Sequence, residues 1–268
     1  YFAGNSLGLQ PKSARVYIEE VLANWEKRGV DGHFEGTHPW FPYHEMFRES
    51  GAKLVGAKPG EVVMMNSLTV NLHLMLVSFF RPTRERYKIL IDAPCFPSDT
   101  YALLTQLRFH GLDSDNALLT VAPREGETTI RTEDIEALLK REGQTIALVL
   151  LSGVNFVTGQ FFDLAAITDA GHRAGCVVGF DLAHAAGNVP LRLHDWEADF
   201  AVWCNYKYLN SGPGAVAGCF VHRRHEASAD RPRFAGWWGN DPATRFRMHL
   251  EKEFVPRPGA EGWQVSNP

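Results

Sequence analysis

The stretch AVWCNYKYLNSGPG (residues 201–214) is an apolar run that ends in a lysine between two tyrosines, followed by a loop of serine, glycine and proline. The run predicts a buried strand with Lys207 beyond its carboxyl end. An isolated ammonium is costly to bury, and burial lowers the pKa of a lysine, which suits reaction with a carbonyl compound. A lysine that extends its amine to water is the simpler interpretation, and for a lone lysine the commoner one.

A second apolar run, CVVGFDLAH (residues 176–184), ends in Asp181 and is followed by His184. Open α/β sheets bind ligands outside the carboxyl ends of their strands. Two successive strands that end in an aspartate and a lysine suit pyridoxal 5′-phosphate (PLP), which needs a lysine and a carboxylate for its ring nitrogen. Asp181 alone is also explained as a helix N-cap, but its pairing with Lys207 favours the cofactor.

Strand, loop and helix alternate from about residue 60 to 205, which predicts one α/β unit with a mainly parallel sheet. The solid apolar run 146–151 is typical of a strand covered on both faces. Further strands are expected at 62–65, 87–92, 116–121 and 216–221. Helices are expected at 11–28, 43–55, 98–110 and 163–174, in a segment that ends at 79, and from a cap at Thr132.

The composition narrows the classes of partner. The chain has 268 residues, a net charge of −4 and no basic block, which argues against nucleic acid or an anionic membrane. No apolar run approaches the length of a membrane span. The four cysteines form no Cys-x-x-Cys pair and predict free thiols in a reducing compartment, the cytoplasm. No metal-ligand spacing is visible, and His222 and His225 are expected at the surface.

Small hydroxyl residues at 66–71 lie where a helix begins, so they are either ordinary N-caps or a phosphate site. Phe96 follows a strand and either fills the core or stacks on a planar ring. The glycine fingerprints of dinucleotide and triphosphate sites do not occur in this sequence, so a nucleotide-binding module is disfavoured. The adjacent Trp237 and Trp238 are expected to be exposed, which suits an interface.

Six segments extend the pattern around Asp181 and Lys207. They are GNSLGLQPK (4–12), APCFPSD (93–99), FDLAHAAGN (180–188), CNYKYLNSGPG (204–214), GWWGN (236–240) and QVSNP (264–268). Together they resemble the kynureninases, which are PLP enzymes of the aspartate-aminotransferase fold, fold type I. The resemblance covers nearly the whole chain, and the combination of motifs is specific where any one alone is weak.

The resemblance implies a role for each matching residue. Lys207 resembles the lysine that binds the cofactor covalently, and Tyr206 touches the phosphate and relays protons. Asp181 resembles the carboxylate at the ring nitrogen, with Asp99 close behind it, and Phe96 stacks on the ring. The remaining cofactor positions are Leu68, Thr69, Pro97, Ser98, Ser152, His184, Trp237 and Asn267. His33, Ser6, Trp237 and Asn267 match positions near the substrate, and a neighbouring subunit contributes Trp237 and Asn267.

The family also implies an architecture. The expected parts are a three-layer PLP-binding large domain at 46–268 and an N-terminal helix and aromatic loop at 1–45 that pack on it. The C-terminal small domain, with the arginine that grips the substrate carboxylate, has no counterpart in this sequence. Since the sequence also opens at Tyr1 without a methionine, we expect both ends to be cut from a longer protein. We also expect a homodimer with shared sites.

The reaction that the resemblance implies is hydrolysis of L-kynurenine to anthranilate and L-alanine by Cβ–Cγ cleavage, in tryptophan catabolism and NAD biosynthesis; 3-hydroxykynurenine is a second possible substrate. One alternative is another enzyme of the fold, a cysteine desulfurase or an aminotransferase. A desulfurase needs a cysteine nucleophile, and Cys95 is the nearest candidate. A non-catalytic scaffold is a further alternative, for which the absent small domain is the best support.

Overall fold

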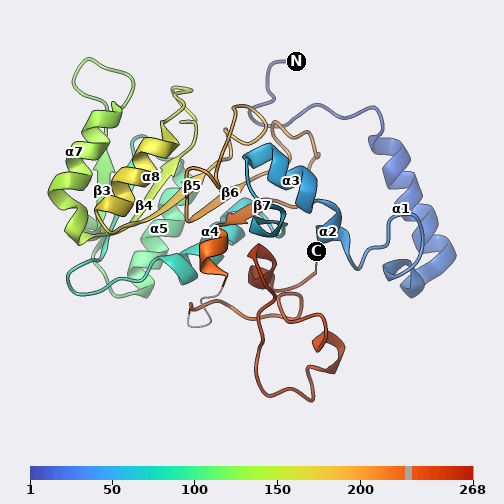
Figure 1. Ribbon diagram of the computed structural model, residues 1–268. Helices are drawn as coiled ribbons and strands as arrows, with labels where there is room; N and C mark the ends of the chain where they lie inside the picture. Colours follow the sequence, from blue (N-terminus) through green and yellow to red (C-terminus); the bar gives the residue numbers. More distant parts are fainter. Residues whose placement is uncertain (227–230, 268) are drawn as a thin grey trace.

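The computed structural model describes residues 1–226 and 231–267, and a seven-stranded sheet lies at its centre (Figure 1). The strand order is β1-β7-β6-β5-β4-β2-β3. The strands are β1 (Val62–Met64), β2 (Lys88–Asp92), β3 (Leu118–Val121), β4 (Ile146–Ser152), β5 (Val177–Asp181), β6 (Phe200–Trp203) and β7 (Gly218–Val221).

The sheet is mainly parallel, as the sequence predicts. Strands β6, β5, β4, β2 and β3 run the same way, and β7 is antiparallel to both of its neighbours. Asp181 at the end of β5 is paired with Ser152 of β4 and with Val202 of β6. The register therefore brings the carboxyl ends of three strands to one edge of the sheet. Val202, the last but one residue of β6, is five residues before Lys207.

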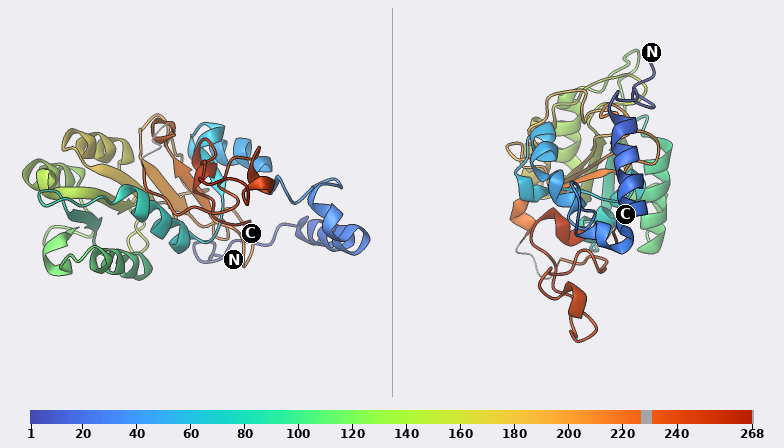
Figure 2. Two further views of the ribbon diagram at one scale, coloured as in Figure 1. Left: turned by 90° about the horizontal axis from the view of Figure 1, so that it is seen from below. Right: turned by 90° about the vertical axis from the view of Figure 1, so that its right-hand side faces the viewer.

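Helices cover both faces of this sheet, which gives three layers (Figure 2). The α-helices are α1 (Ala14–Arg28), α2 (Tyr43–Met46), α3 (Arg48–Val55), α4 (Leu68–Phe79), α5 (Pro97–Phe109), α6 (Ser114–Ala117), α7 (Thr132–Glu142) and α8 (Leu164–Arg173). Short 3-10 helices are η1 (Gly29–His33), η2 (Pro59–Glu61), η3 (Gly143–Thr145), η4 (Arg223–His225), η5 (Arg245–Arg247) and η6 (Ala260–Trp263). Among the described residues, no helix has both the length and the apolar character that crossing a bilayer requires.

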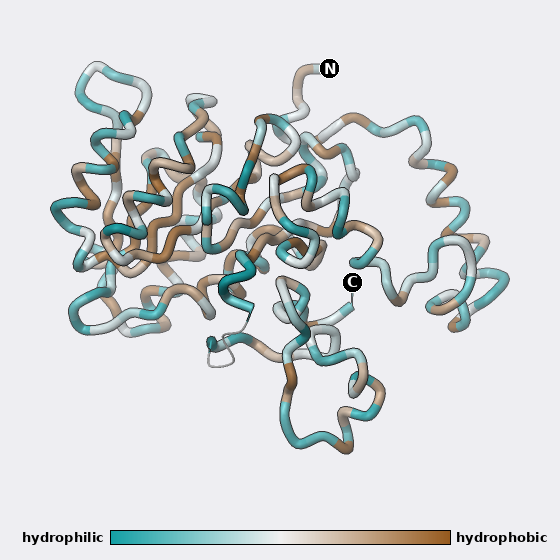
Figure 3. Tube along the Cα trace, viewed as in Figure 1, coloured by the Kyte–Doolittle hydropathy of each residue, from teal (hydrophilic) through white to brown (hydrophobic). Residues whose placement is uncertain are grey.

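Two buried clusters hold the layers together. Met75 of α4 and Leu103 of α5 belong to the cluster on one face, and Ile135 of α7 and Ile167 of α8 to the cluster on the other. The central strands contribute residues to both clusters, so they are largely apolar up to their last residues, as Figure 3 shows. The sheet is thereby fixed from both sides, and the edge at its carboxyl ends has a stable support.

Two local predictions are wrong. The strand expected at 116–121 begins only at Leu118, because residues 114–117 form α6. The Asp113 side chain caps α6 by accepting a hydrogen bond from the Asp115 backbone N–H at 3.2 Å. The single helix expected at 43–55 is broken at Phe47 into α2 and α3.

Helix α1 lies apart from the sheet (Figure 1) and has no buried residue. Val21, Leu22 and Trp25, which the sequence places on one face, are 48%, 55% and 66% exposed. Within this chain α1 therefore does not pack on the large domain, which corrects that part of the expectation for residues 1–45. Residues 29–45 do contact the large domain, since His44 is buried.

Asp199 anchors the start of β6, the strand that leads to Lys207. Its carboxylate accepts a hydrogen bond from the Val178 backbone N–H at 2.7 Å and lies 2.6–2.9 Å from nitrogens of His172, Arg224 and His225. Burial alone would raise the pKa of Asp199. The hydrogen bonds from the two histidines and the Arg224 guanidinium outweigh burial and hold that pKa well below its usual value.

Replacing Asp199 with asparagine is expected to lower the free energy of unfolding at pH 7 by about 1.5–3 kcal/mol, because the half-buried Arg224 guanidinium loses its counter-charge and the hydrogen bonds to the buried carboxylate are lost. A carboxylate whose pKa is depressed by folding stabilises the protein above its unfolded pKa, about 3.9. The difference between the two proteins should therefore shrink as the pH falls below about 4. Urea unfolding against pH measures this, with Asp169→Asn, an exposed ion-pair residue of α8, as a control of near-zero effect. A pH-independent difference would contradict the assignment.

Candidate active site

A cavity of about 450 Å³ lies at the carboxyl edge of the parallel strands. The ends of three strands reach it through Asp92, Ser152 and Asp181, and the segment after β6 reaches it through Lys207. The residues predicted from the sequence that line it are Ser6, Leu68, Thr69, Phe96, Asp99, Ser152, Asp181, His184, Tyr206 and Lys207. The topology thus brings together side chains that are up to 201 residues apart in the sequence.

Lys207 lies between a histidine and an aromatic ring. Its Nζ is 3.0 Å from Nε2 of His184 and 5.9 Å from the centre of the Phe96 ring. Burial, and next the Lys207 ammonium, lower the pKa of His184. A neutral imidazole can accept a hydrogen bond from an ammonium, so His184 orients the lysine amine without adding a second positive charge.

Asp99 and Asp181 form a carboxylate pair at the opposite wall. Burial, and next the negative charge of Asp181, raise the pKa of Asp99 to about 10. Asp181 accepts a hydrogen bond from the Ala183 backbone N–H at 2.6 Å. Asp99 Oδ1 is buried without a hydrogen-bond partner among the described residues. At neutral pH the Asp99 carboxyl is therefore protonated, and Asp181 beside it is the carboxylate that suits a protonated ring nitrogen.

Two helix N-termini meet at another corner of the cavity. Thr69 is the second residue of α4 and Ser98 the second residue of α5, and their hydroxyl oxygens are 3.1 Å apart. Ser67, the N-cap of α4, makes no side-chain capping bond. Free backbone N–H groups at helix starts bind anions. This corner can therefore hold a phosphate, with Pro97 fixing the first turn of α5.

Tyr206 also lines the cavity. Burial, and next its neighbour Cys204, raise the pKa of Tyr206 to about 12. Its phenol therefore stays protonated at neutral pH and can donate a hydrogen bond to an anion.

Sequence reasoning missed several residues of this cavity. Asp92 accepts hydrogen bonds from the Ser152 backbone N–H at 3.0 Å, from its hydroxyl, and from Asn155 Nδ2 at 3.0 Å, so it positions Ser152. Phe156 packs edge-on against Phe96, with ring centres 5.3 Å apart. An acid at the end of the run KILID was a usable signal for Asp92. Phe156 had no signal, because only the fold brings it to Phe96.

Five predicted residues do not line this cavity. Two of them, Pro97 and Ser98, lie in the first turn of α5 between the lining residues Phe96 and Asp99. His33 and Asn267 line a second cavity of about 350 Å³, together with Trp238. Trp237 donates a hydrogen bond from Nε1 to the Arg245 carbonyl at 3.0 Å and is 36% exposed. Trp238 is 2% exposed, so the expectation that both tryptophans are exposed is wrong for Trp238.

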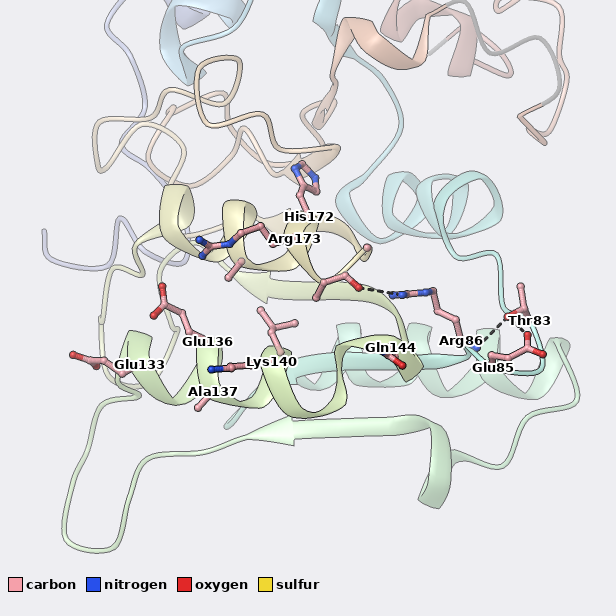
Figure 4. Close-up of a pocket in the computed structure, with 14 residues that line it drawn as sticks. Thr83, Glu85, Arg86, Glu133, Glu136, Ala137, Lys140, Gln144, His172 and Arg173 are labelled. Carbon is pink, nitrogen blue, oxygen red and sulfur yellow. Dashed lines mark hydrogen bonds between the residues drawn. The ribbon is translucent and has the colours of Figure 1, made fainter.

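A wider groove, about 1200 Å³, lies at the opposite edge of the sheet, where α7 and α8 meet the segments before β2, β4 and β5 (Figure 4). Glu133, Glu136, Lys140 and Arg173 give it both signs of charge. Arg86 donates hydrogen bonds to three backbone carbonyls at 2.6–3.0 Å, so its guanidinium ties segments together. No residue predicted for the site lines this groove.

Among the described residues, one group with metal-ligating atoms lies outside the cavity. Atoms of Glu61, His194 and His222 lie within 4.8 Å of one another. Glu61 already accepts two backbone N–H hydrogen bonds at 2.8 and 3.0 Å and contacts His194 Nδ1 at 2.9 Å. The rings of His194 and His222 are parallel, so their nitrogens do not converge. We interpret the group as a hydrogen-bonded cluster. His222 and His225 are buried, which corrects their expected surface position.

The three-layer fold with a lysine at the carboxyl edge defines a class of cofactor-binding enzymes. Residues 17–236 match the family Aminotransferase class-V, and the chain belongs to that family. A solved structure of C-DES with glycine covalently linked to its PLP cofactor superposes with a TM-score of 0.79 at 18% identity, covering 99% of this chain and 66% of that one. A cysteine desulfurase from Thermococcus onnurineus NA1 has a TM-score of 0.70 at 17% identity, covering 100% of this chain and 63% of that one. These two likenesses show the fold.

Curated relatives match the whole chain at much higher identity. The kynureninases of Koribacter versatilis and Myxococcus xanthus are each 61% identical over 268 residues, and that of Nematostella vectensis is 56% identical. Each alignment covers 100% of this chain and 63%, 62% and 57% of the relative, respectively. The resemblance to kynureninases is confirmed, and the chain spans about three fifths of the length of these relatives.

Proposed function

We propose that the complete protein hydrolyses L-kynurenine to anthranilate and L-alanine with PLP as its cofactor. The observation that carries this proposal is the cavity that Lys207, Asp181 and Thr69 line together, with the Ser98 hydroxyl 3.1 Å from that of Thr69. The relatives named kynureninase, 52–61% identical over nearly the full chain, support the substrate. A 3-hydroxylated kynurenine is a related substrate of the same proposal.

The residues of the cavity fit the cofactor. Asp181, next to the protonated Asp99, would bind the ring nitrogen, and Phe96 would stack on the ring. The hydroxyls of Thr69 and Ser98, with the Tyr206 phenol, would bind the phosphate. When bound, PLP supplies a protonated ring that draws electrons from bonds to the substrate's Cα.

The chain's own groups would bind the substrate and move its protons. Lys207 Nζ would hold the cofactor and, once the substrate's amine replaces it, carry a proton to and from the substrate. His184, 3.0 Å from that Nζ, orients it and accepts its hydrogen bond. Tyr206 keeps its phenolic proton at neutral pH and would act as a proton relay. General acid–base steps of this kind contribute about 10²–10⁴-fold each.

The arrangement of the chain supports a homodimer. Helix α1 exposes its apolar residues, and His33, Trp237 and Asn267 lie outside the Lys207 cavity. A second copy would bury α1 and would add Trp237 and Asn267 to its partner's site. The same proposal includes a division of the chain into an N-terminal segment, residues 1–45, and a large domain, residues 46–268. It also includes a small domain beyond residue 268. The four cysteines are free thiols, which supports the cytoplasm.

A cysteine desulfurase reaction is disfavoured by the two cysteines that line the cavity, Cys95 and Cys204, because burial raises the pKa of both thiols. Burial raises the pKa of Cys95 to about 12, so its thiol is not a ready nucleophile. A scaffold without activity is disfavoured by the cavity itself, because an unpartnered buried carboxyl and a lysine are costly to keep without a ligand.

Adding L-kynurenine to the purified complete protein is expected to change the visible absorbance of its cofactor and to release anthranilate and alanine one for one. Absorbance and product chromatography measure both. Sulfide from cysteine, or a keto acid in place of alanine, would move the assignment to a desulfurase or an aminotransferase. A protein without cofactor absorbance, even after addition of PLP, would favour the scaffold.

A further inference from the structure

The N-terminal turn forms part of the cavity wall although it is far from Lys207 in the sequence. Asn5 and Ser6 line the cavity together with Lys207. Residues 1–10 contain no helix or strand, and Asn5 and Ser6 are exposed. A short segment of this kind adopts many conformations unless contacts fix it, so its place over the cavity requires an anchor.

The turn is organised within itself. The backbone N–H groups of Ser6 and Leu7 both donate to the Ala3 carbonyl, at 2.9 and 3.0 Å. The Tyr1 hydroxyl donates to the Leu7 carbonyl at 2.9 Å. These bonds shape the turn, but they do not attach it to the sheet.

The attachment comes from the loop that carries the lysine. The Gly8 backbone N–H donates to the Tyr206 carbonyl at 2.7 Å, and the Leu9 backbone N–H donates to Asn210 Oδ1 at 2.8 Å. These are the hydrogen bonds that join residues 1–10 to the rest of the described chain. The Asn210 backbone N–H donates to the Lys207 carbonyl at 3.1 Å, so one short loop holds both the lysine and the turn.

The backbone geometry at both partners is special. Asn210 has a φ of 57°, in the left-handed region that asparagine tolerates better than most residues. A Cβ on Gly8 would lie 2.1 Å from the Lys207 carbonyl oxygen and 2.3 Å from Asn210 Oδ1. Only glycine permits this approach. Residues 8 and 9 of the turn therefore make a close, specific backbone contact with the loop that carries Lys207.

We propose that Asn210 is a positioning residue that holds Asn5 and Ser6 over the substrate through the Leu9 N–H. Its side-chain oxygen acts through the turn and does not touch the reacting atoms. The polar groups of Asn5 and Ser6 then face an amino-acid substrate bound at Lys207. The kinetic part of this proposal rests on the proposed function, whereas the anchoring of the turn does not.

The test compares two substitutions in the complete protein with its cofactor. Asn210→Gly keeps the left-handed backbone but removes the acceptor oxygen, and Asn210→Asp keeps both. We expect Asn210→Gly to raise KM for L-kynurenine by about two- to tenfold, the effect of one lost hydrogen bond, with a smaller change in kcat. Asn210→Asp should restore KM to within about twofold of wild type, and both should keep the cofactor absorbance.

Hydrogen exchange supplies a readout that needs no substrate. The Leu9 amide should exchange faster in Asn210→Gly by about the same two- to tenfold and stay protected in Asn210→Asp. If wild-type protein does not act on kynurenine but this exchange pattern holds, the proposed function fails and the anchor stands. Unchanged Leu9 exchange in Asn210→Gly, or an Asn210→Asp as impaired as Asn210→Gly, overturns the anchor.

A double substitution tests whether Asn210 acts through Leu9. Leu9→Pro removes the same hydrogen bond from the donor side, and the preceding Gly8 tolerates a following proline. Leu9→Pro combined with Asn210→Gly should have a KM close to that of the more impaired single variant. If the increase in KM of the double variant equals the product of the increases in the two single variants, Asn210 acts by another route and the proposal is overturned.

Discussion

Lys207→Ala is expected to abolish turnover of L-kynurenine, by about 10⁴-fold or more, and to remove the covalent attachment of the cofactor. The amine is both the group that would bind the cofactor and the group that would carry the substrate proton, and each role alone is worth orders of magnitude. Its position supports both roles, since Nζ contacts His184 and lies over the Phe96 ring. Steady-state kinetics and borohydride reduction followed by mass spectrometry measure the two effects.

Two variants serve as controls for Lys207→Ala. Lys207→Arg keeps a positive charge near His184 but cannot attach the cofactor, so it should be as inactive as the alanine variant. His184→Gln keeps a hydrogen-bond acceptor for the lysine and should lose much less activity. Turnover by Lys207→Ala within tenfold of wild type would show that the reaction does not pass through this amine.

Asp181→Asn is expected to have the second largest effect, a loss of about 10²–10³ in kcat, the usual cost of removing one preorganised electrostatic group from an active site. The substitution is isosteric, and the amide oxygen can still accept the Ala183 N–H bond. What it removes is the negative charge that would keep the cofactor ring protonated. The pKa of Asp99 should also fall, because the charge of Asp181 is one cause of its elevation.

Asp99→Asn is the matched control on the other member of the pair. Asp99 is already uncharged at neutral pH, because burial and then Asp181 raise its pKa to about 10. An asparagine is therefore a close replacement, and activity should remain within about tenfold. In the wild-type protein, activity should fall as the pH rises through about 10, because the Asp99 carboxyl then loses its proton. If Asp99→Asn loses more activity than Asp181→Asn, the roles of the two carboxylates are reversed.

Much of the Lys207 cavity was predictable because its residues share one property. Asp181 and Ser152 end strands of a parallel sheet, and Lys207 follows the next strand, so topology alone brings them to one edge. The buried strands were predictable for the same reason, since their apolar runs are continuous. Helix α6 was not predictable from the sequence, because a helix of four residues gives no periodic pattern of apolar residues.

Other parts depend on contacts between distant segments. Phe156 meets Phe96, and Leu9 meets Asn210, only after the sheet has formed. No local pattern marks such residues. His33 and Asn267 were assigned by resemblance, and in this chain they line the second cavity. Their assignment to a substrate site therefore rests on the resemblance, and for Asn267 also on the proposed second subunit, which one sequence does not describe.

The hydrogen bond between the Leu9 N–H and Asn210 has a consequence for biosynthesis. The two residues are 201 positions apart, and a ribosome adds about 5–20 residues per second. The turn that carries Asn5 and Ser6 therefore leaves the ribosome roughly 10–40 seconds before the loop that anchors it. During that interval the turn has no docking partner in the nascent chain. The cavity is consequently completed late, after the lysine loop has emerged, and a chain released before then has no complete site.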